Sequence, residues 1–194
     1  MIAGIILAAG ASSRMGSPKA LLNYRGETFI QRLVRVLSVA CDPVIVVLGY
    51  HAEALRPAVS NATIVINPAP ERGQLSSLQT GLAALPPDAE GFLFTPVDSP
   101  SVEIHTVERL AAAFRHRNPE NQLIIPRYQG KRGHPVFASR VIADELSALP
   151  LTSQARDVIH SYVANTIYVD VDDPGILIDV DDREAYRRLS GAQA

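Results

Sequence analysis

The chain has 194 residues, a length that fits one domain with a continuous hydrophobic core. Its 47% hydrophobic and 20% charged residues are typical of a globular protein, and a net charge of −2 with no basic run argues against nucleic acid or an anionic membrane as the main partner. The single cysteine, Cys41, excludes an internal disulfide, and the first apolar run is too short for a secretory signal or a membrane span, so we expect a cytoplasmic protein.

The first predicted element is a strand over residues 5–9, a short apolar run of the kind that is buried on both faces of a parallel sheet. Strand and helix patterns then alternate, which indicates parallel crossovers. Further strands are expected at 43–48, 63–67, 91–95, 123–126, 135–138, 166–171 and 176–180, and helices at 27–38, 76–85, from Ser101 through Phe114, at 139–146, at 153–162 and from Asp181, as cap, to Leu189. The pattern predicts an α/β fold: a single doubly wound, Rossmann-like domain over residues 1–194 with a mostly parallel central sheet and ligands at the carboxyl ends of its strands.

Two of these expectations concern particular side chains. The helix over residues 27–38 places its apolar residues on one stripe, with Arg32 and Arg35 facing away from the core. Cys41 follows this helix, and nothing near it in sequence would lower its pKa, so we expect a small buried hydrophobe rather than a nucleophile.

Residues 10–19 form a loop directly after the first strand, with small residues that let the backbone approach a ligand and with Arg14 and Lys19 as positive charges. The loop lacks both G-x-x-x-x-G-K-[ST] and G-x-G-x-x-G, which argues against a generic ATPase or a dinucleotide oxidoreductase. A triphosphate is the ligand that most needs this combination of features. The alternative is an ordinary glycine-rich turn with a solvated arginine and lysine.

Asp98 follows the strand over residues 91–95 and lies between Pro96 and Pro100, which stiffen the turn. A carboxylate held in this way suits Mg²⁺, which takes one or two carboxylates together with phosphate oxygens and water. The alternative is that Asp98 caps the next helix.

Residues 73–77 could contact a base or a ribose: Gly73 permits close approach, and Ser76 and Ser77 offer hydroxyls and free amides at a helix start. Ser76 could instead be an ordinary helix cap.

A basic turn over residues 131–134 could bind the phosphate of a second substrate through Lys131, Arg132 and His134, or could be a usual solvated loop.

Near the end of the chain, Asp179 and Asp181 are two residues apart in an expected strand. Alternate side chains of a strand point to the same face, so these two carboxylates should share one face. We expect Asp179 to be the second metal ligand and Asp181 the helix cap.

A further acidic cluster, at Asp170, Asp172 and Asp173, is interpreted as a turn with solvated carboxylates.

The string LAAGASSRMGSPKALL, residues 7–22, resembles the signature loop of the nucleotidyltransferases that make molybdenum cofactor dinucleotides and of related sugar-phosphate nucleotidyltransferases. The proline-flanked Asp98 resembles the metal-binding motif of the same class. The G-x-x-S-S-L turn at 73–78 is similar to that of the cytidylyltransferases for molybdopterin, and R-G-H-P at 132–135 to the stretch that receives the acceptor. The segment from Asp179 resembles the family's D-[IV]-D-T-P-E-D element, but Asp182-Arg183 stands in place of Thr-Pro.

The resemblance implies a Mg²⁺-dependent cytidylyltransferase of the molybdopterin nucleotidyltransferase family, with CTP as donor and the phosphate of molybdopterin as acceptor. The product would pass by transient contact to a molybdoenzyme or its chaperone. GTP as donor, another phosphorylated acceptor, or a non-catalytic nucleotide-binding module are the alternatives. The residues implied are Arg14, Lys19 and Asp98 for catalysis, Leu7, Ala8, Ala9, Gly10, Lys19, Gly73, Ser76 and Ser77 for the nucleotide, Arg132, Gly133 and His134 for the acceptor, and Asp98 and Asp179 for the metal.

Overall fold

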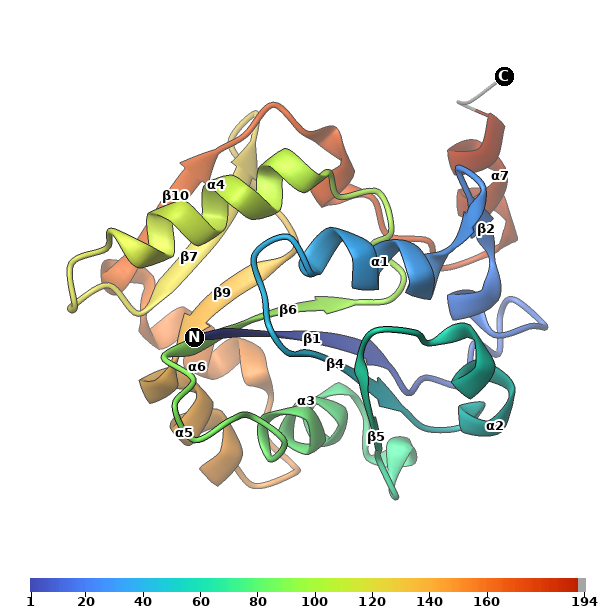
Figure 1. The fold of residues 1–194 in the computed structure, drawn as a ribbon, viewed down its shortest axis with the longest axis horizontal. Helices are drawn as coiled ribbons and strands as arrows, with labels where there is room; N and C mark the ends of the chain where they lie inside the picture. The colour runs from blue at the N-terminus through green and yellow to red at the C-terminus, as the bar shows by residue number, and fades with distance from the viewer. Residues whose placement is uncertain (192–194) are drawn as a thin grey trace.

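A computed structural model describes residues 1–191 of the chain, and its centre is a mixed sheet in the strand order β10-β7-β9-β6-β1-β4-β5, with β8 paired to β7 (Figure 1). The strands β9 and β8 run antiparallel to their neighbours, and every other pairing in this sheet is parallel. The strands are β1 (Ile2–Ala8), β4 (Val44–Leu48), β5 (Thr63–Ile66), β6 (Gly91–Pro96), β7 (Leu123–Tyr128), β8 (Lys131–Arg132), β9 (Val136–Ser139) and β10 (Thr166–Asp170). The predicted α/β class with a mostly parallel central sheet is confirmed.

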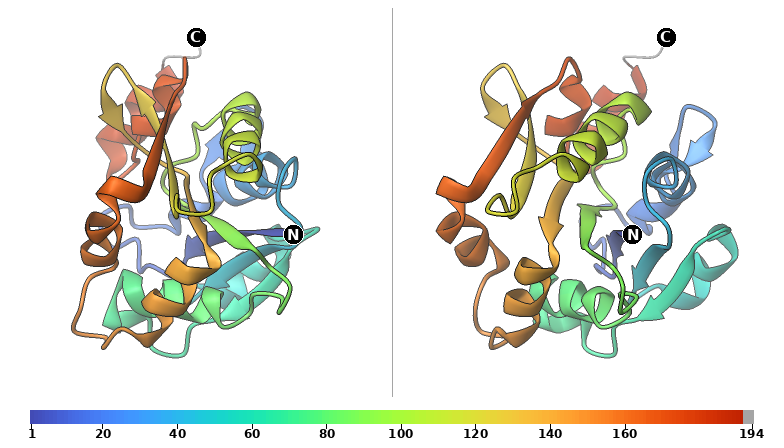
Figure 2. Two further views of the ribbon diagram at one scale, coloured as in Figure 1. Left: turned by 90° about the vertical axis from the view of Figure 1, so that its left-hand side faces the viewer. Right: turned by 60° about the vertical axis from the view of Figure 1, so that its left-hand side comes forward.

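Two helical layers cover the two faces of this sheet (Figure 2). One hydrophobic cluster contains residues of α1 (Phe29–Leu37), α4 (Ile104–Arg115) and α7 (Arg183–Gly191), and the other contains residues of α3 (Gln74–Leu82), α5 (Arg140–Ala148) and α6 (Ala155–Ser161). The central strand β1 is buried along its whole length, with Ile5 paired to Ile45 on one side and to Phe94 on the other. This is why its run of apolar residues is uninterrupted.

Several small elements were not predicted from the sequence. They are the short helix α2 (Ala52–Leu55), the hairpin of β2 (Asn23–Tyr24) and β3 (Glu27–Thr28), and a 3-10 turn over Lys19–Leu21. In Figure 1 the hairpin lies beside α7, and the Tyr186 hydroxyl donates a hydrogen bond to the carbonyl of Asn23 (3.0 Å). These elements are too short for hydrophobic periodicity to reveal them.

The prediction of a strand over residues 176–180 is wrong. A 3-10 turn spans Pro174–Leu177, and the amide of Val180 then donates to the carbonyl of Asp98 (2.8 Å) instead of joining the sheet. The cap of α7 is Asp182, whose carboxylate accepts from the amide of Ala185 (2.8 Å), and not Asp181.

The start of α4 also differs from the prediction. The helix begins at Ile104, and a residue remote in sequence caps it: the Asp173 carboxylate accepts from the amide of Glu103 (3.0 Å) and from the hydroxyl of Thr106 (2.7 Å). Asp173 is 2% exposed, so the interpretation of this residue as a solvated turn carboxylate is wrong. A cap supplied from outside the helix leaves no local sequence signal.

Arg32 does not face away from the core: it is 4% exposed. It lies three residues after Phe29 and four before Val36, both of which are fully buried, so all three share one face of α1. Cys41 is buried, as predicted, and burial raises the pKa of its thiol to about 12.

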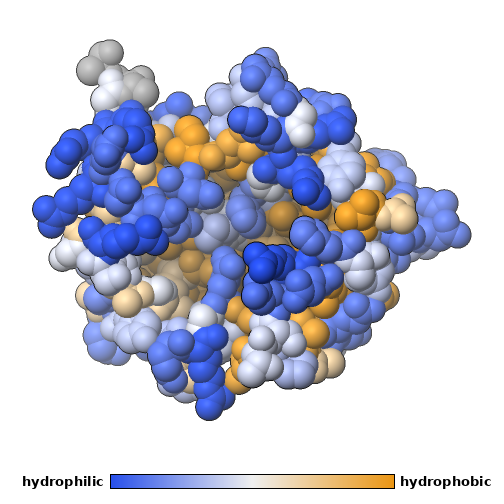
Figure 3. Space-filling view, turned by 180° about the vertical axis from the view of Figure 1, so that it is seen from behind, coloured by the Kyte–Doolittle hydropathy of each residue, from blue (hydrophilic) through white to orange (hydrophobic). Residues whose placement is uncertain are grey.

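Hydrophilic residues cover most of the back of the molecule, and hydrophobic residues show in the hollows between them (Figure 3). Among residues 1–191, no helix has both the length and the apolar character needed to cross a bilayer.

Candidate active site

A cavity of about 290 Å³ opens at the carboxyl ends of β1 and β6. Its lining contains nine of the residues that the resemblance assigns to catalysis, nucleotide, acceptor or metal: Leu7, Ala8, Ala9, Gly10, Arg14, Lys19, Gly73, Ser77 and Asp98. It does not contain five others, which are Ser76, Arg132, Gly133, His134 and Asp179. The structure therefore brings the loop after β1, the turn after β6 and the start of α3 to one place, as expected for an open α/β sheet.

The loop over residues 10–19 is held by hydrogen bonds within it and by a contact from the C-terminal helix. The amide of Lys19 donates to Ser12 Oγ (3.1 Å), and the amide of Met15 donates to the carbonyl of Ser12 (2.9 Å). Arg183, from the start of α7, donates from Nε to the carbonyl of Met15 (3.2 Å), and the Met15 side chain is buried. The loop is thus anchored to the C-terminal helix.

A second loop, directly after β4, packs against the first. A Cβ atom added at Gly49 would lie 2.6 Å from the carbonyl oxygen of Ala9, so only glycine permits this approach. His51 Nε2 lies 2.9 Å from the carbonyl oxygen of Ala11, and His51 lines the cavity. Sequence reasoning missed this residue, although its position after a buried parallel strand places it at the same sheet edge as Gly10.

Lys19 connects the loop to the acidic side of the cavity. Its Nζ lies 3.1 Å from Asp98 Oδ2 and 3.0 Å from Asp181 Oδ1. Arg14 Nη2 lies 3.7 Å from the same oxygen of Asp181, and 70% of the Arg14 side chain is exposed, against 12% for Lys19. Lys19 is therefore a nearly enclosed counter-ion, whereas Arg14 extends into the open mouth of the site.

Burial raises the pKa of Asp98, the ammonium of Lys19 opposes this shift, and the nearby carboxylates of Asp179 and Asp181 add to it. Asp179 accepts a hydrogen bond from the hydroxyl of Ser99 (2.6 Å), which holds it beside the Asp98 turn. Lys19 therefore pairs with two carboxylates, Asp98 and Asp181, and the charge of a third, Asp179, acts on Asp98, an arrangement that favours a further cation.

The donor atoms suit Mg²⁺. Within the part of the chain that the structure describes, no three acidic, histidine or cysteine side chains form a complete metal cage. Mg²⁺ needs no such cage, because it takes one or two carboxylates and completes its shell with phosphate oxygens and water. Asp98 and Asp179 fit this pattern, and the ammonium of Lys19 already occupies a cation position next to Asp98.

The start of α3 forms the opposite wall of the cavity. The helix begins at Gln74 after Gly73, whose φ of 89° is a conformation that favours glycine. Ser76 is therefore not the helix cap, and its hydroxyl donates to Asn67 Oδ1 (3.2 Å), behind the cavity wall. Asn67 Nδ2 donates to Ser77 Oγ (3.1 Å), so this buried asparagine orients the serine that does line the cavity.

The basic turn lies outside the cavity. Arg132 is exposed on β8, and a Cβ atom at Gly133 would lie 2.1 Å from the carbonyl oxygen of Ile176, so Gly133 is required by packing. The His134 ring lies edge-on to Phe94, with ring centroids 6.0 Å apart. Within residues 1–191, the buried Nδ1 of His134 has no hydrogen-bond partner; burial lowers the pKa of this histidine, whereas the charges of Asp179 and Asp98 raise it.

The fold and the whole length of the chain are similar to a solved structure. The crystal structure of Rv0371c from Mycobacterium tuberculosis is 33% identical, covers 98% of this chain and 97% of its own, and superposes with a TM-score of 0.83. A complex of Rv0371c with manganese is 31% identical, covers 98% of each chain and gives a TM-score of 0.79.

Curated relatives carry more than one name. The molybdenum cofactor cytidylyltransferase of Escherichia coli is 27% identical over 91% of this chain and 89% of its own length. The molybdenum cofactor guanylyltransferase of Sinorhizobium fredii is 31% identical over 88% of this chain and 78% of its own length. A protein of Paenarthrobacter nicotinovorans named nicotine blue oxidoreductase is 36% identical over 70% of this chain and 69% of its own length.

The family model for the MobA-like NTP transferase domain matches residues 4–166. This range contains the loop over residues 10–19, the Asp98 turn and the start of α3, which are the parts that meet at the cavity. The resemblance noted from the sequence is confirmed, and the chain belongs to the MobA-like NTP transferase family.

Proposed function

We propose that the protein transfers a nucleoside monophosphate, CMP from CTP, to the phosphate of molybdopterin with release of pyrophosphate and with Mg²⁺ as its metal. The observation that carries this proposal is the contact of Lys19 with Asp98 and Asp181 at the cavity. It places a cationic loop, suited to a triphosphate, within bonding distance of carboxylates suited to a divalent cation.

The assignment of the acceptor and the assignment of the donor base are supported by different observations. The names of the relatives from Escherichia coli and Sinorhizobium fredii support the molybdenum cofactor as the acceptor. Those two names differ in the base, so the preference for CTP rests on the G-x-x-S-S-L turn, of which Gly73 and Ser77 line the cavity. The manganese complex of Rv0371c supports a divalent cation.

In the proposed reaction a phosphate oxygen of the acceptor attacks the α-phosphorus of the nucleoside triphosphate in line. A new P–O–P bond forms, the bond from the α-phosphorus to the oxygen that bridges to the β-phosphate breaks, and pyrophosphate leaves with that electron pair. A phosphate monoester is already largely ionised near neutral pH, so no strong base is needed. The protein contributes positioning and charge neutralisation.

The scheme gives roles to Arg14, Lys19, Asp98 and Asp179. Arg14, at the exposed mouth, binds the departing pyrophosphate, and Lys19 exchanges a carboxylate partner for phosphate oxygens. The Asp98 and Asp179 carboxylates would hold Mg²⁺, which supplies further neutralisation of the phosphate charge when it is bound. Arg132 and His134 are assigned to the acceptor, outside the donor cavity.

The test is pyrophosphate release with each of four nucleoside triphosphates and Mg²⁺, with and without molybdopterin. CTP-dependent release that requires the acceptor is the expected result. Release with GTP alone contradicts the cytidylyl assignment, and tight nucleotide binding without release for every acceptor tried indicates a binding module. Asp98→Asn should abolish release, whereas Asp88→Asn, at an exposed aspartate outside the cavity, should not change it.

A further inference from the structure

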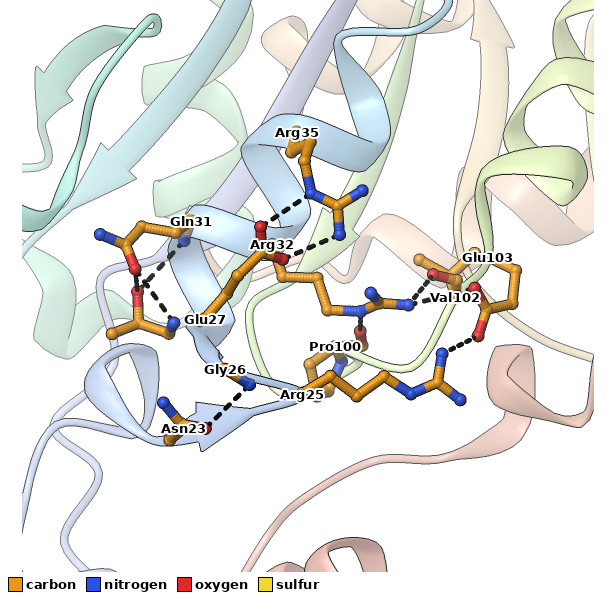
Figure 4. Close-up of polar contacts among 11 residues, drawn as sticks. Asn23, Arg25, Gly26, Glu27, Gln31, Arg32, Arg35, Pro100, Val102 and Glu103 are labelled. Atoms are coloured by element: carbon orange, nitrogen blue, oxygen red, sulfur yellow. Dashed lines mark hydrogen bonds and ion pairs between the residues drawn. The ribbon is translucent and has the colours of Figure 1, made fainter. Parts of the chain in front are cut away.

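Arg32 brings a positive charge into the interior between α1 and the segment that follows Asp98. Its Nε donates to the carbonyl of Pro100 (2.8 Å), and its Nη2 donates to the carbonyl of Val102 (3.3 Å) and to Glu103 Oε2 (3.2 Å) (Figure 4). The Arg32 side chain is 5% exposed. Burying an unpaired guanidinium is strongly unfavourable, so these acceptors make its position in the core tolerable.

The geometry of these bonds constrains the backbone. Two of the three acceptors are main-chain carbonyls, and Pro100 and Val102 are both buried, so each carbonyl needs a donor. Pro100 has no amide hydrogen with which to anchor itself. A guanidinium is a rigid planar fork, and binding two carbonyls two residues apart fixes the path of the chain between them.

The same segment is held on its other side by residues from the end of the chain. The amide of Val180 donates to the carbonyl of Asp98 (2.8 Å), and Ser99 donates to Asp179 (2.6 Å). Asp173 accepts from the amide of Glu103 (3.0 Å). The segment that begins with the Asp98 turn therefore forms hydrogen bonds with Arg32 on one side and with residues 173–180 on the other.

We propose that Arg32 is a positioning residue, which sets the direction of the Asp98 carboxylate so that it binds the divalent cation of the donor site. This inference rests on the proposed function. Arg32 touches neither the cavity nor Asp98, so it acts only through the backbone of residues 98–103. If the role of Arg32 were purely structural, its substitution would lower the free energy of unfolding without changing the affinity of the folded protein for the cation.

The variant that separates these roles is Arg32→Lys. Lysine keeps the charge and most of the length but offers one ammonium in place of the planar fork, so it cannot hold both carbonyls in the same way. Arg35→Lys is the matched control: Arg35 lies in the same helix and binds Glu27 through two bonds of 2.8 Å, with no contact to the Asp98 turn. Arg32→Met is the stronger change, and it is measured in the same way if the variant folds.

The measurement is Mn²⁺ binding to the nucleotide-free full chain, followed through the signal of free Mn²⁺ in electron paramagnetic resonance, after urea unfolding shows that each variant is folded. We expect Asp98→Asn to remove the site and Arg32→Lys to weaken Mn²⁺ binding about 10-fold, as substitutions behind metal ligands do. Arg35→Lys should leave binding unchanged. Pyrophosphate release is measured on the same proteins.

Equal Mn²⁺ affinity in the wild type and in folded Arg32→Lys would overturn the inference. So would a wild type that does not bind Mn²⁺, or whose binding does not depend on Asp98. If Arg32→Lys weakens Mn²⁺ binding while no nucleoside triphosphate is turned over by the wild type, the proposed function fails and the role of Arg32 stands.

Discussion

The ion pair between Lys19 and Asp98 gives the sharpest prediction about this site. Its charged atoms are 3.1 Å apart, and 12% of the Lys19 side chain and 25% of the Asp98 side chain are exposed. At this distance, effective dielectric constants between about 80 and about 20 give an attraction of about 1 to 5 kcal/mol. Because Asp98 is partly exposed, screening and side-chain ordering bring the expected coupling to about 1–2 kcal/mol.

The assay is a double-mutant cycle of Lys19→Met and Asp98→Asn, with free energies of unfolding measured in urea. The control cycle uses Arg127 and Asp170, whose pair of 2.7 Å is 38% and 69% exposed and should give less than about 1 kcal/mol. A Lys19–Asp98 coupling no larger than that of the control refutes the view of Lys19 as an enclosed counter-ion.

The coupling should also depend on pH. Because the pKa of Asp98 is raised in the folded state, that state binds a proton more tightly than the unfolded chain does, and stability falls as pH rises from the ordinary carboxyl value through the folded pKa. Lys19→Met removes the cation that opposes this shift, so the folded pKa should rise further. The stability deficit of Lys19→Met should therefore be full at neutral pH and should shrink as pH falls through the folded-state pKa of Asp98, which lies above the ordinary aspartate value of about 4; the unfolded-state pKa is common to both proteins and cancels.

Three further predictions concern residues outside the cavity. Burial raises the pKa of Cys41 to about 12 from an ordinary thiol value of 9.0, so alkylation by iodoacetamide at pH 8 should be about 1,000-fold slower in the native protein than in urea; equal rates contradict this burial. Gly133→Ala should lower the free energy of unfolding by about 1–3 kcal/mol, since its Cβ would meet the carbonyl of Ile176 at 2.1 Å. The exposed Arg132→Ala should be as stable as the wild type and should raise only the KM for the acceptor, and an unchanged KM removes Arg132 from acceptor binding.

Most strands of the central sheet and the donor site were predictable because their signals are local. A buried parallel strand shows as an unbroken apolar run, and the residues after β1 and β6 reach one sheet edge by topology alone. Gly10, Lys19 and Asp98 could therefore be brought together from the sequence.

The supports of the site could not be found in this way, because they join residues far apart in the chain. In the sequence, Arg32 has the pattern of a solvated helix residue and Asp173 that of a loop carboxylate. In the structure, Arg32 binds the segment that follows Asp98, and Asp173 caps α4. The same holds for Asp181, which was expected to cap α7 and instead pairs with Lys19 across 162 positions of sequence. A polar residue with distant partners leaves no periodic pattern.

The anchoring of the loop over residues 10–19 by the C-terminal segment affects when the site can form during biosynthesis. Asp181 and Arg183 are synthesised more than 160 residues after Lys19 and Met15, yet they contact them. Because synthesis adds residues from the N-terminus onward, a nascent chain can assemble the sheet and still lack the contacts that fix its triphosphate loop. Nucleotide binding should therefore begin only after Asp181 and Arg183 have emerged from the ribosome, which keeps shorter nascent chains from binding the donor nucleotide.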